Sequence, residues 1–411
     1  MKLLRLNAEN FRNIELASLR FEKASTFLLG RNGQGKTNLL EAAGMVTALR
    51  SFRTSEARSL IRHGQRQARL FLECEREGEG AAEITLSFAS AGKQITCDGE
   101  NVTRLADFIG RFPTVTLSSE DIQLIRGGPA LRRRFLDLTL SAMRPDYFEA
   151  LRRYHRALKE RNSLLKSGQG PRAEAELSAF DKALAPAAVT VCHLRREGVE
   201  VLTKHLCAAY AIISEGAEEP ELRYRPESGM DSPETALKTL RESRAADFAL
   251  KSTQRGPHRD DLGLYVAGKR ARDYASEGQQ RSYVVSLRLA QMTCFEESSG
   301  VAPVILADDV LGELDPVRRQ RFWGAVGADR QIIATGTEPP PPGEREWDIL
   351  RVDAGTFSRE SEMAPDAVQD ETAAASPTRA EQAPARQEAP ASQPPSTPGA
   401  DGPEAEARPD R

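Results

Sequence analysis

Two periodicities of apolar and polar positions run along the chain, and they predict where strands and helices lie. Short apolar runs and two-residue alternation, both typical of strands, fill roughly the first 120 residues and return after about residue 260. We expect strands over residues 3–6, 14–21, 26–29, 68–75, 83–89, 93–97, 114–117, 262–266, 269–274, 301–307, 331–335 and 348–352. The first should be an edge strand, and 262–266 should form a hairpin with 269–274.

The middle of the chain has a different pattern, because its apolar residues recur at helical spacing with charges between them. We expect a helix that ends near Leu49, helical segments over 137–166 and 174–214, and further helices over 235–250 and 277–297. The glycine-rich stretch 167–171 should separate the two central segments into a helical hairpin or a small lobe. Residues 253–261 should be a polar loop.

These patterns predict an α/β protein with an inserted helical lobe. We expect residues 1–115 and 251–358 to form the two halves of one α/β lobe, and residues 116–250 to form the insertion. The remaining residues, 359–411, are rich in Ala, Pro, Glu, Gln and Ser. Such a composition buries too little apolar surface to offset the entropy of ordering, so we expect a disordered acidic tail.

The net charge of −3 hides an uneven distribution. Residues 359–411 contain eleven Asp and Glu and five Arg, a balance of −6, which leaves +3 for residues 1–358. A mildly basic body suits a polyanionic partner. No apolar run approaches the ~20 residues of a membrane span, the first residues are too charged for a signal peptide, and five scattered cysteines read as reduced thiols. We therefore expect a cytoplasmic protein without a membrane partner.

The expected strand 26–29 leads into a glycine-rich stretch, Gly30-Arg31-Asn32-Gly33-Gln34-Gly35-Lys36-Thr37. Strand, glycine loop and helix is the context of a phosphate-binding loop, whose N–H groups point at phosphate oxygens. Lys36 would reach the β- and γ-phosphates, and the hydroxyl of Thr37 would hold Mg²⁺. A glycine-rich turn with a chance lysine is the alternative, and the flanking pattern makes it much the weaker one. The stretch predicts ATP and Mg²⁺ as cofactors.

Two stretches near the end of the α/β body complete this prediction. The apolar run 303–307 ends in Asp308, which would reach the Mg²⁺ shell, and in Asp309, which would polarise the attacking water. The helix expected at 277–297 opens with Ser276-Glu277-Gly278-Gln279, with Ser276 as N-cap and free N–H groups for an anion. Alone, these stretches could be an acidic turn and an ordinary capped helix. Their order after a phosphate loop is typical of ABC-class ATPases, whose signature segment acts on the nucleotide of the partner subunit.

Several separated stretches within residues 1–358 resemble the RecF family, which is related to the SMC (structural maintenance of chromosomes) proteins. These stretches are residues 6–13, 30–42, 51–54, 60–62, 128–137, 256–261 and 276–282. The most diagnostic is Gly128-Pro129-Ala130-Leu131-Arg132-Arg133-Arg134, since transporter ATPases have nothing like it. After the strand 331–334, Thr335 or a neighbour holds the position of the transporter histidine.

The resemblance implies an ABC/SMC-type P-loop ATPase head that dimerises on ATP and clamps double-stranded or gapped DNA with slow hydrolysis. It also implies a weak, DNA-dependent ATPase that works with RecO and RecR to load RecA during recombinational repair, replication restart and the SOS response to DNA damage. Arg12 resembles a nucleotide-contacting position, although a surface arginine is nearly as good an interpretation. The remaining alternative is another ABC-class ATPase that drives a protein or transport partner.

Candidate DNA-binding residues are basic side chains that follow the first helix. They are Arg50, Arg53, Arg62 and Arg66, to which the run Arg132–Arg134 can be added. Basic side chains bind phosphates without reading sequence, and their affinity falls steeply with salt. The alternative, about equally supported, is that these arginines are solvated or hold structural carboxylates. Gln123 could be the glutamine that senses Mg²⁺ in such ATPases, but a solvated helix residue is the better interpretation.

Overall fold

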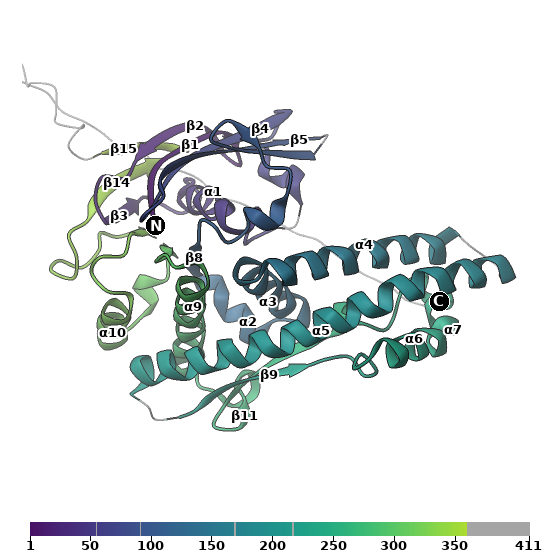
Figure 1. Cartoon of the computed structure of the whole chain (residues 1–411). Coiled ribbons are helices and arrows are strands. Elements are labelled where there is room, and N and C mark those ends of the chain that lie inside the picture. The colour runs from purple at the N-terminus through teal and green to yellow at the C-terminus, as the bar shows by residue number, and fades with distance from the viewer. Residues whose placement is uncertain (55, 91, 168–169, 216–217, 360–411) are drawn as a thin grey trace, which may run out of the picture. The chain divides into compact units, whose positions relative to one another are not determined.

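The computed structural model describes residues 1–359 except 55, 91, 168–169 and 216–217. The expected tail therefore lies, apart from Arg359, outside the described residues. Two large sheets, a smaller sheet and a group of long helices make up the described chain (Figure 1). None of the helices in these ranges is long and apolar enough to cross a membrane.

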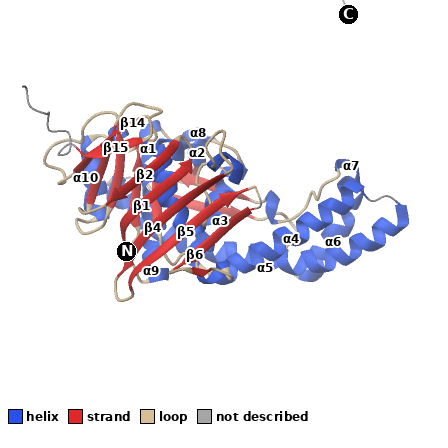
Figure 2. Cartoon of the chain, turned by 90° about the horizontal axis from the view of Figure 1, so that it is seen from above, coloured by secondary structure: helices blue, strands red, loops and turns tan. Residues whose placement is uncertain are grey.

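The first sheet has six antiparallel strands in the order β2-β1-β4-β5-β6-β7, five of which are labelled in Figure 2. Its strands are β1 (Lys2–Phe11), β2 (Ile14–Arg20), β4 (Gln67–Arg76), β5 (Gly80–Ala89), β6 (Gly92–Cys97) and β7 (Glu100–Asn101). The expectation of an edge strand over 3–6 is wrong, because β1 pairs with both β2 and β4. It is also longer than expected, since Ala8 and Phe11 continue the buried side of the strand.

The second sheet is mostly parallel and has the order β15-β14-β3-β13-β12-β8. Its strands are β3 (Ser25–Leu29), β8 (Thr114–Ser118), β12 (Val304–Asp308), β13 (Ile332–Gly336), β14 (Asp348–Asp353) and β15 (Thr356–Arg359), and only β15 is antiparallel to its neighbour. Strands β3 and β12 are buried almost throughout, as expected for parallel strands covered on both faces. The carboxyl ends of β3, β13 and β12 therefore meet at one edge of the sheet.

Helix α1 (Lys36–Ala48) lies between the two large sheets (Figure 1). Its residues Leu39, Leu40 and Val46 share one apolar core with β1 of the first sheet and with Leu306 of the second. Burying one helix between two sheets removes most of its side chains from water, which is the main source of its stability. The start of α1, where the glycine loop lies, is fixed by both sheets.

The helices beyond the sheets are α2 (Gln123–Arg126), α3 (Pro129–Met143), α4 (Pro145–Ser167), α5 (Gly170–Ser214), α6 (Pro233–Glu242), α7 (Arg244–Leu250), α8 (Ala271–Tyr274), α9 (Glu277–Ser299) and α10 (Pro316–Val326). Figure 2 shows α4, α5 and α6 extending beyond the edge of the first sheet. One core joins these helices to α9 and to the smaller sheet. The lobe boundaries expected from the sequence stay a prediction.

Two helical expectations need correction. The segment 137–166 is two helices, because Pro145 has no N–H to donate and cannot continue α3. The helix expected over 235–250 breaks at Ser243, where the side chain donates to Leu240 O over 3.0 Å and competes with the helical ladder. The expected polar loop 253–261 is mostly irregular but contains one turn of 3₁₀ helix, Pro257–Arg259.

The smaller sheet has three antiparallel strands, β9 (Pro220–Arg225), β10 (Asp261–Val266) and β11 (Lys269–Arg270), in the order β11-β10-β9. The patterning did not predict β9. The strand expected over 269–274 is wrong beyond Arg270, because the chain turns into α8 and buries Ala271 in the helical core. The hairpin about residues 267–268 is confirmed.

Candidate nucleotide-binding site

The glycine loop expected between β3 and α1 is held in a conformation that needs its glycines. Gly33 and Gly35 have φ values of 80° and 113°, in the region that favours glycine. Gly30 faces β14 so closely that a Cβ there would lie 2.3 Å from Val352 O. Gln34 ties the loop to the β14–β15 turn, since its side-chain oxygen accepts from the N–H of Ala354 over 2.6 Å. Arg31 and Asn32 at the tip of the loop are exposed.

Lys36, the first residue of α1, places its ammonium group within this loop. The side chain is buried, and Nζ donates to Gly30 O over 2.7 Å and to Arg31 O over 3.1 Å. Neutral carbonyls are weak partners for a buried cation, whereas phosphate oxygens form the stronger, charge-assisted bonds. The geometry therefore suits an anion that takes over these contacts.

Thr37 and Asp308, separated by 271 positions in the sequence, meet at the edge of the second sheet. Thr37 Oγ1 donates to Asp308 Oδ1 over 2.9 Å. Thr335, at the end of the neighbouring strand β13, donates to the same oxygen over 3.0 Å and accepts from the N–H of Asp309 over 3.0 Å. The structure thus brings the glycine loop and the Asp-Asp strand together in space. The sequence marks Thr335 only by its position after the strand, and in the structure its hydroxyl contacts both carboxylates, over 3.0 Å for Asp308 and 3.5 Å for Asp309.

Asp308 has the properties of a cation ligand. It is buried, and burial raises the pKa of this carboxyl, with the hydroxyls of Thr37 and Thr335 partly opposing the shift. Hydroxyl and carboxylate oxygens are the protein ligands that Mg²⁺ prefers, with waters and phosphates in its other positions. The residues present therefore fit Mg²⁺. Asp309 is less buried than Asp308 and adopts a positive φ of 52°.

A buried ion pair joins Arg12 to Glu41 of α1, the helix that the glycine loop leads into. The guanidinium of Arg12 donates to Glu41 of α1 through Nε over 2.9 Å and through Nη2 over 2.7 Å, and Nη1 donates to Ser59 O. Glu41 is fully buried and also accepts from the hydroxyl of Ser51. Arg12 thus has a structural partner for each side of its guanidinium. Its proposed contact to nucleotide stays a prediction that the ion pair makes less favourable.

The signature stretch lies at the start of α9 and is a complete capping box. Ser276 Oγ accepts from the N–H of Gln279 over 3.3 Å, and Gln279 Oε1 accepts from the N–H of Ser276 over 2.6 Å. Gly278 faces the guanidinium of Arg318, and a Cβ there would lie 3.4 Å from it. Within the described ranges, no recorded hydrogen bond joins this stretch to the glycine loop or to Asp308. Among the described residues, recorded hydrogen bonds therefore join the glycine loop to the Asp-Asp strand but do not join either of them to the signature stretch.

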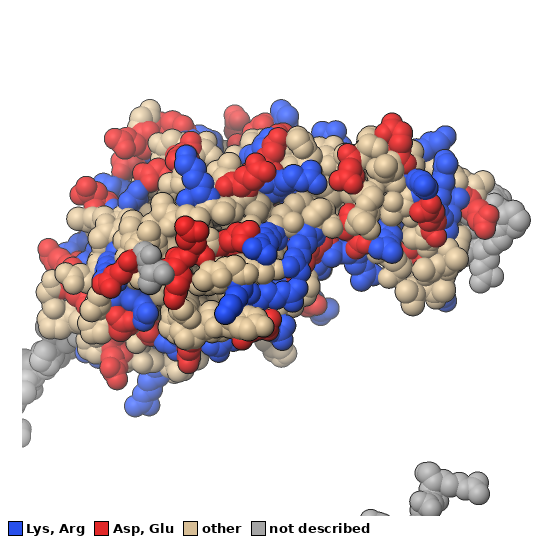
Figure 3. All heavy atoms as spheres, turned by 90° about the horizontal axis from the view of Figure 1, so that it is seen from below, with Lys and Arg blue, Asp and Glu red and all other residues tan. Residues whose placement is uncertain are grey.

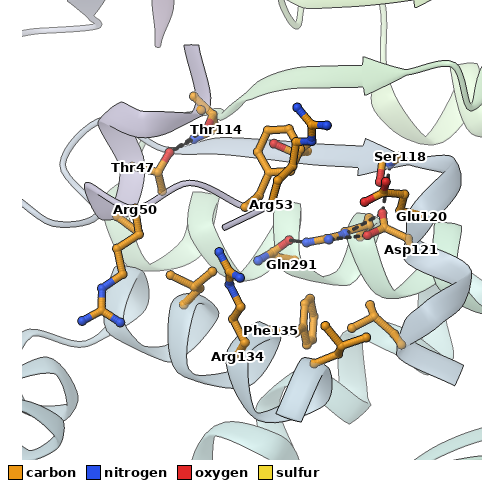
Figure 4. A pocket seen from close by; sticks show the side chains of 18 of the residues that line it. Thr47, Arg50, Arg53, Thr114, Ser118, Glu120, Asp121, Arg134, Phe135 and Gln291 are labelled. Carbon is orange, nitrogen blue, oxygen red and sulfur yellow. Dashed lines mark hydrogen bonds and ion pairs between the residues drawn. The ribbon is translucent and has the colours of Figure 1, made fainter. Parts of the chain in front are cut away.

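Of the four arginines first proposed to bind DNA, two are exposed and the other two contact neighbouring side chains. Arg50 and Arg66 are exposed. Arg53 donates to Asn38 Oδ1 over 2.9 Å, and Arg62 lies 2.9 Å from the carboxylate of Glu15. Arg50, Arg53 and Arg134 line a cavity of about 220 Å³ (Figure 4), and Gln123 is also among its lining residues. Arg62 and Arg66 are not among its lining residues.

The run Arg132–Arg134 is mostly engaged in structural contacts. Arg132 forms a bidentate pair with Asp261, over 2.8 and 3.1 Å. Arg133 donates to Asp260 O, and Arg134 donates to the carbonyls of Ser51 and Thr54. These bonds attach α3 to β10 and to the segment after α1. The structural interpretation of this run has the better support.

Comparison with known proteins places this fold and site in a class. The family described as RecF/RecN/SMC N terminal domain matches residues 2–339. Together with the sheet order and the motifs, the match defines a P-loop ATPase head of the RecF/RecN/SMC type. The predicted fold class is confirmed for the described residues.

Individual relatives narrow the class. The DNA replication and repair protein RecF of Desulforudis audaxviator is 36% identical over 371 residues, which cover 88% of this chain and 100% of the relative. The RecF of Synechococcus sp. (strain JA-2-3B'a(2-13)) is 35% identical over 348 residues, covering 82% and 91%. Solved structures of the recombination mediator protein RecF, as RecF-ATP and RecF-ATPrS, superpose on this chain with TM-scores of 0.78 and 0.77. Both are 30% identical to it and cover 87% of its length, and the matched parts are 97% and 98% of the solved chains. The chain belongs to the RecF family.

Proposed function

We propose that this chain binds Mg-ATP, dimerises on it, and in that state clamps double-stranded or gapped DNA with slow hydrolysis. The observation that carries the proposal is the meeting of Thr37 with Asp308, while the signature at Ser276 has no recorded contact to either among the described residues. One chain thus provides half of a nucleotide site and, elsewhere, the other half. A second copy that offers its signature completes the site.

In the first half-site each residue has a stated role. Lys36 and the loop N–H groups, from Gly30 to Gly35, hold the β- and γ-phosphates. Thr37 and Asp308 hold Mg²⁺, which when bound neutralises phosphate charge. Asp309 polarises the attacking water, and the hydroxyl of Thr335 holds Asp308 and Asp309 in place. Relatives solved as RecF-ATP and RecF-ATPrS, at 30% identity, support the choice of nucleotide.

In the second half-site, Ser276, Gly278 and Gln279 of one protomer contact the phosphates bound by the other. The capping box already fixes the hydroxyl of Ser276 at the helix start. The guanidinium of Arg318, which pairs with Asp315 over 2.6 Å, lies close to Gly278. ATP then acts as the link between two protomers. Such a switch needs little turnover, so hydrolysis is weak and DNA-dependent.

The biological role follows from the family. Relatives are named DNA replication and repair proteins, and the solved ones are placed in the RecFOR pathway. We infer that this chain works with RecO and RecR to load RecA at gapped DNA, in the bacterial cytoplasm. The exposed Arg50 and Arg66 are the candidates for DNA phosphates among the four arginines first considered. An ABC-class ATPase that drives a protein or transport partner is the alternative, and no observation favours it.

Two variants test the two half-sites separately. Lys36→Ala should abolish ATP binding in calorimetry, because the ammonium that contacts phosphate is gone. Ser276→Arg should bind ATP normally but fail to dimerise with ATP in light scattering. Ser232→Arg is its matched control, since Ser232 caps α6 with the same kind of box and lies outside the proposed site. Dimerisation by Ser276→Arg as complete as by Ser232→Arg would disprove the two-protomer site.

A further inference from the structure

The smaller sheet has one face that the nucleotide site does not use. Alternation along β9 and β10 points Leu222, Leu262 and Leu264 into the helical core. Arg223 and Arg225 of β9 therefore point to the opposite face. The register places Tyr265 of β10 beside Arg270 of β11, so these two residues share that outer face. We call Arg223, Arg225, Tyr265 and Arg270 the outer face of the small sheet.

The arginines of this face are held in a fixed arrangement. The guanidinium carbons of Arg223 and Arg225 lie 4.1 and 5.6 Å from the centroid of the Tyr265 ring. Arg225 also donates to the hydroxyl of Tyr265. The tyrosine is 4% exposed, because the two arginines cover it. Stacking on an aromatic ring limits the rotamers of an arginine while leaving outer N–H groups for a partner.

Acidic residues balance only part of this charge. Glu221 pairs with Arg223 over 2.6 Å, and Asp261 is paired with Arg132 from α3. Within the described ranges, no ion pair to an acidic residue is recorded for Arg225 or Arg270. The outer face therefore keeps a net positive charge after its own acids are paired.

The adjoining hairpin and α8 extend the basic surface toward the signature. Lys269, Arg270, Arg272 and Tyr274 are all exposed, with Asp273 among them as the opposing charge. Tyr274 is 69% exposed, and Lys269 Nζ lies 5.6 Å from its ring centroid. Figure 3, which views the molecule from the side where β9 and β11 lie in Figure 1, shows Lys and Arg gathered near the middle of this face.

We propose that the outer face of the small sheet, with the hairpin and α8, binds the sugar-phosphate backbone of DNA. The inference rests on the proposed function and names a second DNA surface for it, apart from Arg50 and Arg66. Cations spread over three elements suit an extended polyanion better than a single phosphate. The hydroxyl of the exposed Tyr274, beside lysine and arginine, can add a further hydrogen bond to a phosphate oxygen. Because α8 leads directly to Ser276, DNA on this surface would lie next to the signature.

The test compares two double variants with equal loss of charge. R225S/R270S removes two cations from the proposed surface, and K2S/R20S removes two exposed cations from β1 and β2 as the control. Anisotropy of labelled duplex DNA is measured with ATP over a series of salt concentrations. R225S/R270S should weaken binding roughly tenfold or more at low salt and reduce the slope of log affinity against log salt by about 2. K2S/R20S should change neither quantity.

Each other outcome has a defined meaning. Affinity and salt slope unchanged in R225S/R270S would overturn the inference and leave the proposed function intact. Loss of ATP-dependent dimerisation in this variant, seen by light scattering, would assign the face to the contact between protomers and also overturn it. Wild-type protein that never binds DNA would overturn both. Because Arg225 covers Tyr265, R270S/R272S serves as a second variant whose residues have no recorded contact to that ring.

Discussion

Glu41 offers the sharpest test of how the glycine loop is supported. Its carboxylate is fully buried on α1 and accepts two bonds from Arg12, one from Ser51 and a longer one, over 3.5 Å, from Arg53. Glu41→Gln keeps the shape of the side chain and removes its charge. The guanidinium of Arg12 then loses its counter-ion while its side chain stays 19% exposed.

The expected loss of unfolding free energy in Glu41→Gln follows from this geometry. Removing one partner of a buried ion pair costs about 3–5 kcal/mol, because a charge is left without compensation. Glutamine still accepts one hydrogen bond and Arg12 keeps some contact with water, so we expect a loss at or just below the low end of this range, about 2–3 kcal/mol of unfolding free energy. Glu15→Gln is the control. Its carboxylate pairs with Arg62 but is 74% exposed, and exposed pairs contribute about 0–1 kcal/mol.

The assay is urea unfolding followed by tryptophan fluorescence, and a double mutant completes it. Arg12→Met with Glu41→Leu removes both charges and should recover most of the loss, since no buried charge remains. A cost for Glu41→Gln as small as for Glu15→Gln would refute the reasoning. The double mutant also tests the predicted nucleotide contact of Arg12, because normal ATP affinity in a stable Arg12→Met background would exclude it.

Three further predictions concern pH and the loop. Only the charged form of Asp308 binds a cation, and burial raises the pKa of this carboxyl. As the pH is lowered, Mg²⁺-dependent ATP affinity should therefore begin to fall at a higher pH than for an ordinary aspartate. Calorimetry from pH 8 to 5 checks this, and an ATP affinity that does not change with pH contradicts it. Burial lowers the pKa of His258 from 6.5 to about 4, so its contribution to the unfolding free energy is full above pH 6.5 and should be lost as the pH falls toward 4, by ~3 kcal/mol at most. In His258→Gln, the unfolding free energy measured in urea should depend less on pH over this range. A pH dependence equal to that of the wild type would count against this prediction. Gly30→Ala should lower ATP affinity at least tenfold, because its Cβ would lie 2.3 Å from Val352 O, whereas Gly312→Ala, in open space, should not; equal affinities would contradict the geometry.

The pattern of apolar positions predicted most of the framework. The strands of the parallel sheet read directly from short buried runs, and the meeting of Thr37 with Asp308 follows from the rule that parallel strands end at one edge. The glycine loop was predictable because its conformation depends on local residue types. Helix α10 could also have been predicted, since Asp315 caps it and Pro316 begins it, and both are standard signals of a helix start.

Other features depend on contacts between distant residues, which a single sequence does not display. Strand β9 carries only two inward apolar residues, Leu222 and Tyr224, too few for a clear alternation. The buried pairing of Arg12 with Glu41 joins two ordinary charged positions, and only the packing of α1 against β1 brings them together. Thr335 became recognisable only once β13 was placed beside β12.

The central claim is that ATP binding at Lys36 controls DNA binding. We would measure the anisotropy of labelled duplex DNA titrated with protein, with ATP, with ADP and without nucleotide, for wild type and Lys36→Ala. The account predicts tight binding with ATP alone and none in the variant, although the variant stays folded. Binding of equal affinity in all conditions would mean that the basic surfaces act without the nucleotide, and it would contradict the clamp.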